Sequence, residues 1–542
     1  MSRTASGALP VYRVARARRP WRLSDGAATR LATFGLVALI TAAAFWLRTA
    51  ELAGWDGTLA IDEARLALAA RGIVEQGAPV LPSGWNYTRG LLGAYLIAPS
   101  LAILGESDFA ARLPSALAGT ALVPVAFLLG REVGGRAGGV FVALYAMSHP
   151  ALVVLSRQAW FYAPYVLLFT VALLFIVRAH RTAGARDQIL AGGIAGASLF
   201  AHELGIFLLV PLGAQVVARL WSERRSPRGW LAPLASLAIV AAALTLLWLS
   251  VTSLRASSLV GTYGEVNEYF DPRVEWANVR SYGWMLLDGF GLLLATALAG
   301  LVPAVRERRF VPVLLWLALL PPFVHAAFII PRTPQERYGL TLVVVLALLA
   351  AESARAWAGR LHLRFGSRRG GALAVAVAAI AAIIVVRDVD AALDRRAPRD
   401  SDGAGLREVR ALGLGPEDIV MTDVPTVVGW YVGGVDVWLS SREYEKYATH
   451  DGNDLRDVHT GALLVRNRRE LEHAASRLGE RRTAWVIGSG RNYQWGDLVD
   501  SDLKRFLEQA AVERVRSGDS TRIWRLELPG CLHPLDNGCA TR

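Results

Sequence analysis

Long apolar stretches separated by short polar turns fill the first 387 residues of the chain. Most of them are close to the ~20 residues that an α-helix needs to cross a bilayer, so the pattern predicts a polytopic helical bundle. The stretches lie at roughly 31–50, 113–130, 137–155, 160–177, 188–201, 204–220, 230–251, 284–304, 310–330, 338–357 and 371–387. A further stretch, 90–104 (GLLGAYLIAPSLAIL), is so short that its length does not decide whether it crosses the membrane.

Arginines orient the predicted spans. Seven of them precede the first stretch and no cleavage site follows it, so we expect a retained span whose basic N-terminus (1–30) is cytoplasmic. If 90–104 does not cross, every Arg-rich loop faces the cytoplasm; if it crosses, all of them face outward. These loops lie at 131–136, 178–186, 224–228, 306–309 and 360–369. The positive-inside rule favours the first arrangement. It gives about eleven spans within 31–387, with 90–104 as a re-entrant or interfacial helix in a first outer loop at 51–112.

Residues 388–542 have a mixed charged and polar composition and, in this topology, lie outside the cytoplasm. Short β-rich runs (IVMTDV, VDVWL, ALLV, TAWVIGS, TRIWRLEL) alternate there with helical patterns (GLREVRALG, RRELEHAASRLG, SDLKRFLEQAAVERV). Such alternation predicts a small extracytoplasmic α/β domain. Cys531 and Cys539 would meet an oxidising compartment, in which a short-range disulfide is expected to form.

Composition supports a membrane protein of mostly α-helical fold. The 542 residues are 53% hydrophobic and 19% charged, with a mean hydropathy of +0.34, which excludes a disordered, collagen-like or disulfide-stapled chain. The net charge of +12 is explained by cytoplasmic loops, so no nucleic-acid partner is expected. The sequence contains no CxxC pair and no HExxH, Walker A or GxSxG motif.

The first outer loop contains the clearest candidate chemistry, in TLAIDEARLALAARGIVEQG (58–77). One interpretation of Asp62 and Glu63 is structural, since acidic residues suit the first turn of a helix. The other is a carboxylate pair at the membrane surface, which accepts a proton from a hydroxyl or binds a metal.

The segment Asp-Glu-Ala-Arg-x-Ala-x-x-Ala-Arg resembles the Asp-Glu signature of the C-type (GT-C) integral-membrane glycosyltransferases, in particular the protein O-mannosyltransferases and the aminoarabinose–lipid A transferase. Four more segments resemble elements of this family, and they occur in the same order. Two departures stand out: Glu203 lies where the family usually has an aromatic residue, and two prolines that usually follow the Arg-Tyr pair are missing after Tyr338. They are GESDFAARLPSALAGT, SRQAWFYAP (156–164), FAHELGIFLLV and QERYGLTLVVVLALLAA. The resemblance covers about residues 30–357, and the motifs fall at the outer face of the topology derived from arginines.

The resemblance implies a sugar donor linked to polyprenyl phosphate and transfer on the extracytoplasmic side. It makes Asp62 the catalytic carboxylate, supported by Glu63. The site residues that it implies fall into two groups. Arg89, Arg157, Arg337 and Tyr338 would bind the donor phosphate, and Tyr162, His202 and Glu203 would line the substrate cavity. Arginine suits phosphate because its planar fork bonds two oxygens at once.

A divalent metal ion is left open, with Asp62, His202 and Glu203 as candidate ligands. A structural task is the alternative for Arg157, at a span end, and for Arg337, at an outer turn.

We therefore expect a multi-pass protein of the inner (plasma) membrane that transfers a sugar from a polyprenyl-phosphate donor to an acceptor, whether lipid, glycan or protein. Its partners would be that donor, membrane lipids and the acceptor. Two other classes stay open: a transporter or flippase with an outer domain, and a non-catalytic scaffold of envelope assembly. Against a transporter, the chain shows neither an inverted repeat nor charges at the middle of its spans.

Overall fold

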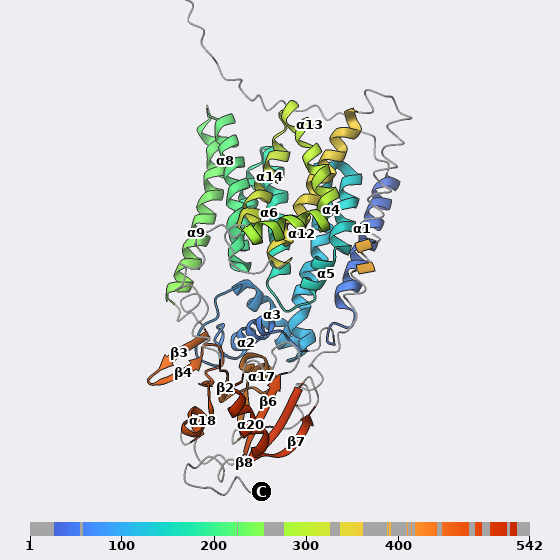
Figure 1. Cartoon of the computed structure of the whole chain (residues 1–542). Coiled ribbons are helices and arrows are strands. Elements are labelled where there is room, and N and C mark those ends of the chain that lie inside the picture. The colour runs from blue at the N-terminus through green and yellow to red at the C-terminus, as the bar shows by residue number, and fades with distance from the viewer. Residues whose placement is uncertain are drawn as a thin grey trace, which may run out of the picture.

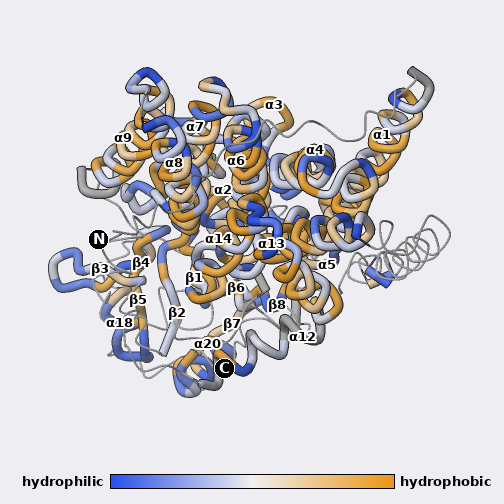
Figure 2. Tube along the Cα trace, turned by 90° about the horizontal axis from the view of Figure 1, so that it is seen from above, coloured by the Kyte–Doolittle hydropathy of each residue, from blue (hydrophilic) through white to orange (hydrophobic). Residues whose placement is uncertain are grey.

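The protein consists of a helical bundle and a sheet domain at one end of it (Figure 1). The computed structural model describes most of the chain. The described residues are 27–54, 58–224, 226–253, 276–325, 336–360, 387–388, 390–391, 409, 414, 418–441, 447–475, 483–489, 499–517 and 521–527. Seen from above, hydrophobic residues dominate bundle helices such as α6 (Tyr162–Thr182) and α9 (Leu231–Ser253), whereas the tip between strands β3 (Ala448–Asp451) and β4 (Asp454–Asp457) is hydrophilic (Figure 2).

The first half of the bundle follows the predicted stretches closely. Its helices are α1 (Ala27–Thr49), α4 (Asp108–Ser148), α5 (Pro150–Ser156), α6 (Tyr162–Thr182) and α7 (Ala185–Ala201). Helix α4 has two arms, because Gly135 interrupts it with a φ of 75°. The arms pack tightly: a Cβ on Gly130 would lie 2.9 Å from the carbonyl oxygen of Gly138. The predicted stretch 113–130 therefore lies in the first arm of α4. The next predicted stretch, 137–155, forms the second arm of α4 and most of α5.

The second half of the bundle combines long helices with short 3₁₀ turns. Its elements are η1 (Glu203–Leu208), α8 (Leu209–Ser222), η2 (Pro227–Trp230), α9 (Leu231–Ser253), α12 (Trp276–Ala299), α13 (Leu301–Arg306), α14 (Phe310–Val324) and η4 (Glu336–Gly339), followed by helix to residue 360. Among the described candidate spans, the helix that ends at residue 360 is the most deeply enclosed, since 83% of the residues in its most apolar segment are buried among its neighbours.

Six helices among the described residues are long and apolar enough to cross a membrane, and three shorter ones are strongly apolar. A multi-pass membrane protein is therefore confirmed, whereas the count of about eleven spans stays a prediction. The predicted stretch 371–387 lies outside the described residues except for its last one.

The marginal stretch 90–104 forms α3 (Leu91–Leu104), a helix of 14 residues. At 1.5 Å per residue it spans about 21 Å, which is less than the ~30 Å hydrocarbon core. It lies beside α2 (Ile61–Gln76) at the end of the bundle that faces the sheet domain (Figure 1). The Arg-rich turn after α13 lies at the opposite end, as the interfacial placement of 90–104 requires.

The C-terminal domain is built on an eight-stranded sheet in the order β3-β4-β5-β2-β1-β6-β8-β7. A parallel centre (β5-β2-β1-β6) is flanked by antiparallel strands on both sides. The elements are β1 (Asp418–Thr422), α17 (Pro425–Val432), β2 (Val437–Leu439), β3 (Ala448–Asp451), β4 (Asp454–Asp457), β5 (Leu463–Val465), α18 (Arg468–Ala475), β6 (Thr483–Ser489), α20 (Ser501–Ala510), β7 (Ala511–Ser517) and β8 (Thr521–Glu527).

All five predicted β-rich runs form strands of this sheet, and two of the three helical patterns form α18 and α20. The third pattern, 405–413, and the predicted Cys531–Cys539 disulfide lie outside the described residues apart from position 409. The prediction was wrong for AVERV, which is strand β7 and not the end of a helix. Pairing with β8 overrides the local helical pattern there, because the strand completes the edge of the sheet.

Helix α2 is anchored by a buried ion pair. The carboxylate of Glu63 accepts hydrogen bonds from Nε of Arg112 at 3.1 Å and from the backbone N–H of Ala60 and Ala159 at 2.9 and 2.6 Å. The side chains of Glu63 and Arg112 are only 1% and 0% exposed. Arg112 also donates to the carbonyl oxygen of Thr58. One contact group thereby joins the start of α2 to α4 and to the turn before α6.

The sheet domain is docked on α2 through α17, which contacts both the segment just before α2 and the second half of α2. Helix α17 places Tyr431 so that its hydroxyl donates to Asp108 at 2.9 Å and accepts from the N–H of Leu59 at 3.1 Å. Arg71 of α2 forms a two-pronged pair with Glu106, at 2.7 and 2.8 Å, and donates to the carbonyl oxygen of Trp430. These contacts fix the first outer loop between the bundle and the sheet.

We predict that Arg112→Met destabilises the protein by about 3–5 kcal/mol, because it leaves the Glu63 carboxylate buried without its cation. Thermal unfolding of the purified protein in detergent measures the effect. The matched control is Arg468→Met, which removes a surface pair with Glu472 on α18 and should cost less than about 1 kcal/mol. Equal losses in the two variants would contradict the anchoring role of the buried pair.

We also predict the sidedness of two exposed positions. In a background in which Cys531 and Cys539, the two cysteines of the chain, are replaced by serine, Asp451→Cys should react with an impermeant maleimide applied to intact cells. Ser226→Cys, in an Arg-rich turn, should react only after the cells are permeabilised. The opposite labelling pattern would invert the topology.

Candidate active site

Asp62 lies in the first turn of α2, where two arginines hold its carboxylate. Oδ1 is 3.1 Å from Nη1 of Arg65, one helical turn later, and Oδ2 is 3.2 Å from Nη1 of Arg337. Arg337 belongs to η4, which is 275 positions away in the sequence. The Asp62 side chain is 31% exposed, in contrast to the buried Glu63 beside it. The structure therefore brings the predicted catalytic carboxylate and one predicted phosphate ligand into direct contact.

The charge around Asp62 sets its protonation state. Shielding by the surrounding protein would by itself raise the pKa of this carboxyl, but Arg65, Arg89 and Arg337 outweigh it and hold the pKa below its usual range. Asp62 is therefore ionised at neutral pH. The opposite effect acts on the nearby Tyr87, since burial raises the pKa of its phenol to about 12 and keeps it protonated.

Arg89 is placed by a turn that requires glycine. Gly90 has a φ of +60°, and a Cβ there would lie 2.2 Å from the ring of Phe161. The guanidinium of Arg89 lies 5.6 Å from the centre of that ring and 3.3 Å from Oε1 of Glu203. Behind Glu203, the buried His202 accepts a hydrogen bond from the backbone N–H of Leu204 through Nδ1. We call Asp62, Arg65, Arg89, Glu203 and Arg337 the Asp62 cluster.

Aromatic rings back the Asp62 cluster. The guanidinium of Arg337 lies 5.3 Å from the ring centres of both Trp160 and Tyr338. Tyr162 is buried, with its ring 5.4 Å from Trp160 and 5.0 Å from His202. Three residues predicted for the site, Tyr162, His202 and Tyr338, thus surround its arginines. The first two are buried, so they shape the cluster from behind.

Two predicted site residues lie elsewhere. Glu63 is turned into the protein and held by Arg112, so it orients α2 and does not face the same surroundings as Asp62. Arg157 has a fully buried side chain that donates to the carbonyl oxygens of Leu47 and Ala50 at the end of α1. In the structure these bonds close the end of α1, and no hydrogen bond or ion pair described for Arg157 joins it to Asp62; its binding of the donor phosphate stays a prediction.

The described residues do not provide a metal site. No group of three or more His, Cys, Asp or Glu side chains comes together within the part of the chain that the structure describes. Of the three candidate ligands, His202 and Glu203 lie together, with Nδ1 of His202 3.2 Å from Oε2 of Glu203, whereas Asp62 is held by arginines. These side chains fit an anion-binding cluster better than a cation-binding one.

Three residues of the cluster and its surroundings were not predicted. Arg65 could have been found, because a spacing of three places it beside Asp62 on a helix. Trp160 lies within a quoted motif but carries no charge that would mark it. Tyr447, whose ring centre lies 4.8 Å from the guanidinium of Arg65, comes from the sheet domain, and no local pattern connects it to α2.

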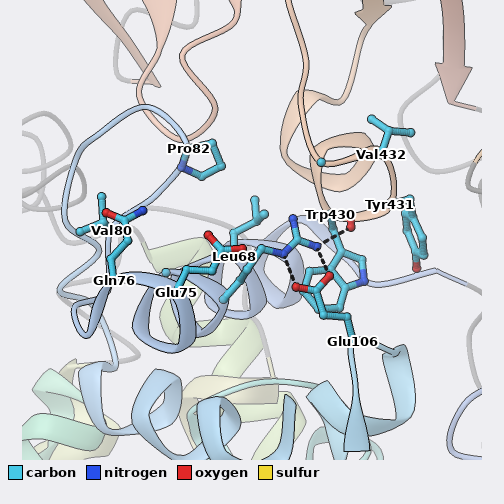
Figure 3. A pocket seen from close by; sticks show the side chains of 12 residues that line it. Leu68, Glu75, Gln76, Val80, Pro82, Glu106, Trp430, Tyr431 and Val432 are labelled. Atoms are coloured by element: carbon cyan, nitrogen blue, oxygen red, sulfur yellow. Dashed lines mark hydrogen bonds and ion pairs between the residues drawn. The ribbon is translucent and has the colours of Figure 1, made fainter. Parts of the chain in front are cut away.

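A pocket of about 460 Å³ lies further along α2, where α17 is docked (Figure 3). Leu68, Arg71 and Glu75 of α2 line it together with Glu106 and Trp430, and the guanidinium of Arg71 is held by Glu106. None of the residues that line it belongs to the Asp62 cluster. The pocket is therefore a feature of the domain junction.

Comparisons with known proteins agree with this architecture. Residues 88–248 match the family model of dolichyl-phosphate-mannose-protein mannosyltransferases. Crystal structures of ArnT from Cupriavidus metallidurans, apo and bound to undecaprenyl phosphate, superpose with TM-scores of 0.60 and 0.59 at 16% identity, over 91% of this chain and 98% of ArnT. The archaeal oligosaccharyltransferase AglB from Archaeoglobus fulgidus, in complex with an inhibitory peptide and a dolichol-phosphate, gives 0.55 at 13% identity, over 86% of this chain and 70% of AglB.

None of the curated protein sequences matches the chain. The structural similarity nevertheless extends over the bundle and the sheet domain, because it covers nine tenths of the residues. The order of the sequence motifs agrees with it. The chain is thus a multi-pass membrane protein that shares its fold with ArnT and AglB.

Proposed function

We propose that this protein transfers a sugar from a polyprenyl-phosphate donor to the hydroxyl of an acceptor outside the cytoplasm. The observation that carries the proposal is the Asp62 cluster, in which an ionised carboxylate lies among arginines at the bundle end facing the sheet domain. A transferase of this kind needs a base for the acceptor and cations for a phosphate leaving group. The fold shared with ArnT, whose crystal structure holds undecaprenyl phosphate, supports this choice.

Asp62 is the base in the proposed reaction. The acceptor oxygen forms a bond to the anomeric carbon while the bond from that carbon to the phosphate oxygen breaks, and the hydroxyl proton passes to Asp62. The electron pair of the broken bond leaves with the polyprenyl phosphate. Displacement in one step inverts the anomeric configuration, as the resemblance implies. A base with a lowered pKa is weak, so we infer that its main contribution is to orient the acceptor hydroxyl.

Arg89 and Arg337 stabilise the leaving group. Negative charge accumulates on the phosphate in the transition state, and fixed guanidinium groups near it lower the barrier. Arg337 can hold a phosphate oxygen through one N–H group while Nη1 stays on Asp62. It would then connect the two sides of the reacting centre. Arg89 contacts Glu203 in the structure, so a phosphate that reaches it must compete with a carboxylate.

Each part of the chain has its own proposed side of the membrane. Residues 1–30 form a cytoplasmic N-terminus, 31–387 the transferase bundle with its catalytic first outer loop 51–112, and 388–542 an extracytoplasmic domain. A lipid donor can enter from the inner (plasma) membrane, since the Asp62 cluster lies where the bundle ends. The acceptor, whether lipid, glycan or protein, would approach from the side of the sheet domain.

We predict that Asp62→Asn lowers turnover of polyprenyl-phosphate sugars by about 10²–10⁴-fold, because the amide neither accepts the hydroxyl proton nor carries the charge that orients the acceptor. Release of radiolabelled sugar from the lipid, by purified protein in detergent, measures turnover. The control is Glu75→Gln, which neutralises an exposed carboxylate on the same helix and should leave turnover unchanged. Full activity of Asp62→Asn would remove this residue from the proposed mechanism.

We also predict that Glu203→Gln binds undecaprenyl phosphate more tightly, because it removes the carboxylate that competes for Arg89. A part-exposed ion pair contributes about 0.2–1 kcal/mol, so the Kd should fall by a factor of roughly 1.4 to 5. Native mass spectrometry with this lipid measures the change. Arg89→Met, as the matched control, should weaken binding. An unchanged or higher Kd in Glu203→Gln would show that the phosphate does not use Arg89.

A further inference from the structure

The sheet domain reaches the Asp62 cluster through Tyr447. This residue directly precedes β3, and the guanidinium of Arg65 lies 4.8 Å from the centre of its ring. The same guanidinium holds Oδ1 of Asp62 at 3.1 Å. An aromatic ring at this distance attracts a cation through its negative face. The two contacts form a continuous connection from the C-terminal domain to the proposed catalytic carboxylate.

Backbone hydrogen bonds fix the segment that carries Tyr447. Its carbonyl oxygen accepts a hydrogen bond from the N–H of Val458 at 2.9 Å, which continues the pairing of β3 with β4. Val458 and His459 are in turn tied to the first outer loop, because the hydroxyl of Ser83 donates to the carbonyl oxygen of Val458 and its N–H donates to that of His459. The ring is thus held against α2 from both domains.

The turn after β4 strengthens this attachment. Asp457 is buried and accepts hydrogen bonds from the N–H and the hydroxyl of Thr460, at 2.8 and 2.6 Å. Gly461 has a φ of +77°, and a Cβ there would lie 3.4 Å from Cα of Ser83. The sheet domain and the first outer loop therefore meet in a closely packed contact next to Arg65.

We propose that Tyr447 is a positioning residue for the active site: its ring holds the Arg65 guanidinium against Asp62. Arg65 has a long side chain with many rotamers, and one ion pair with a part-exposed carboxylate is a weak restraint. A ring on the other side of the guanidinium restricts it to the geometry in which it contacts Asp62. The catalytic meaning of this restraint rests on the proposed function, whereas the restraint itself does not.

Several ionisable groups near Asp62 influence the pKa of its carboxyl or interact with its charge. Arg65 belongs to its own helix, Arg89 and Arg337 approach from other segments, and all three lower the pKa of Asp62. Tyr87 and His459 also interact with it electrostatically. Burial lowers the pKa of His459, which keeps this ring neutral at neutral pH and leaves Arg65 as the cation that Tyr447 controls.

Infrared titration of the Asp62 carboxyl tests the proposal without any substrate. The band is identified by its loss in Asp62→Asn, and the full-length protein in detergent is titrated over the acidic range while tryptophan fluorescence reports folding. A midpoint raised by about one pH unit is expected for Arg65→Met, which removes an opposite charge. Tyr447→Leu keeps an apolar side chain but no π face, and should raise the midpoint by about half a unit. Tyr447→Phe keeps the ring and should match the wild type.

A midpoint in Tyr447→Leu equal to that of the wild type, while Arg65→Met shifts it, would overturn the proposal, and so would equal shifts in Tyr447→Phe and Tyr447→Leu. If Tyr447→Leu does not fold, the comparison of Tyr447→Phe with Tyr447→Met decides in the same way. Turnover of a set of radiolabelled polyprenyl-phosphate sugars is measured on the same samples. Inactive wild-type protein with the expected titration shifts would reject the proposed function and keep the positioning role.

Discussion

The buried contact between Glu63 and Arg112 is the interaction on which the site depends. It closes the first turn of α2, receives the N–H of Ala159 and links segments that lie far apart in the chain. Because a helix presents successive residues about 100° apart, fixing Glu63 toward the interior turns Asp62 toward the arginines. Two adjacent carboxylates thereby acquire different roles. One is a structural anchor in a dry environment, and the other stays part-exposed and is available for chemistry.

Charge balance explains the rest of the Asp62 cluster. Three guanidinium groups repel one another, and because their side chains are only 15–31% exposed, water screens them incompletely. Asp62 and Glu203 supply the compensating negative charge. A phosphate that enters the cluster can replace Glu203 on Arg89, while Asp62 stays bound to Arg65 and Arg337. The departure from the family pattern at position 203 thus places an internal anion where the lipid phosphate is proposed to bind.

Much of the fold was predictable because its signals are local. Apolar runs near 20 residues, arginines in the turns and alternating strand and helix patterns can all be recognised within short windows of sequence. Helix α3 and five of the eight strands of the sheet were predicted from such patterns. The site was only partly predictable. Arg157 and Arg337 look alike in sequence. In the structure, however, Arg157 donates hydrogen bonds to the end of α1, whereas Arg337 pairs with Asp62. Such a difference arises from tertiary contacts, as does the strand at AVERV. The same holds for Tyr447, since nothing near it in sequence refers to α2.

The C-terminal domain is part of the architecture of the site. Its contacts with the first outer loop occur at both ends of α2, through Tyr447 near Asp62 and through α17 near Arg71. A helix held at both ends by a second domain cannot tilt alone, so any movement of the sheet domain relative to the bundle changes the surroundings of the carboxylate. An acceptor that binds the sheet domain would therefore act on the same helix that carries the base. In the proposed reaction, recognition of the acceptor and orientation of Asp62 would thus be coupled through α2, while the lipid donor would approach from the membrane-embedded side.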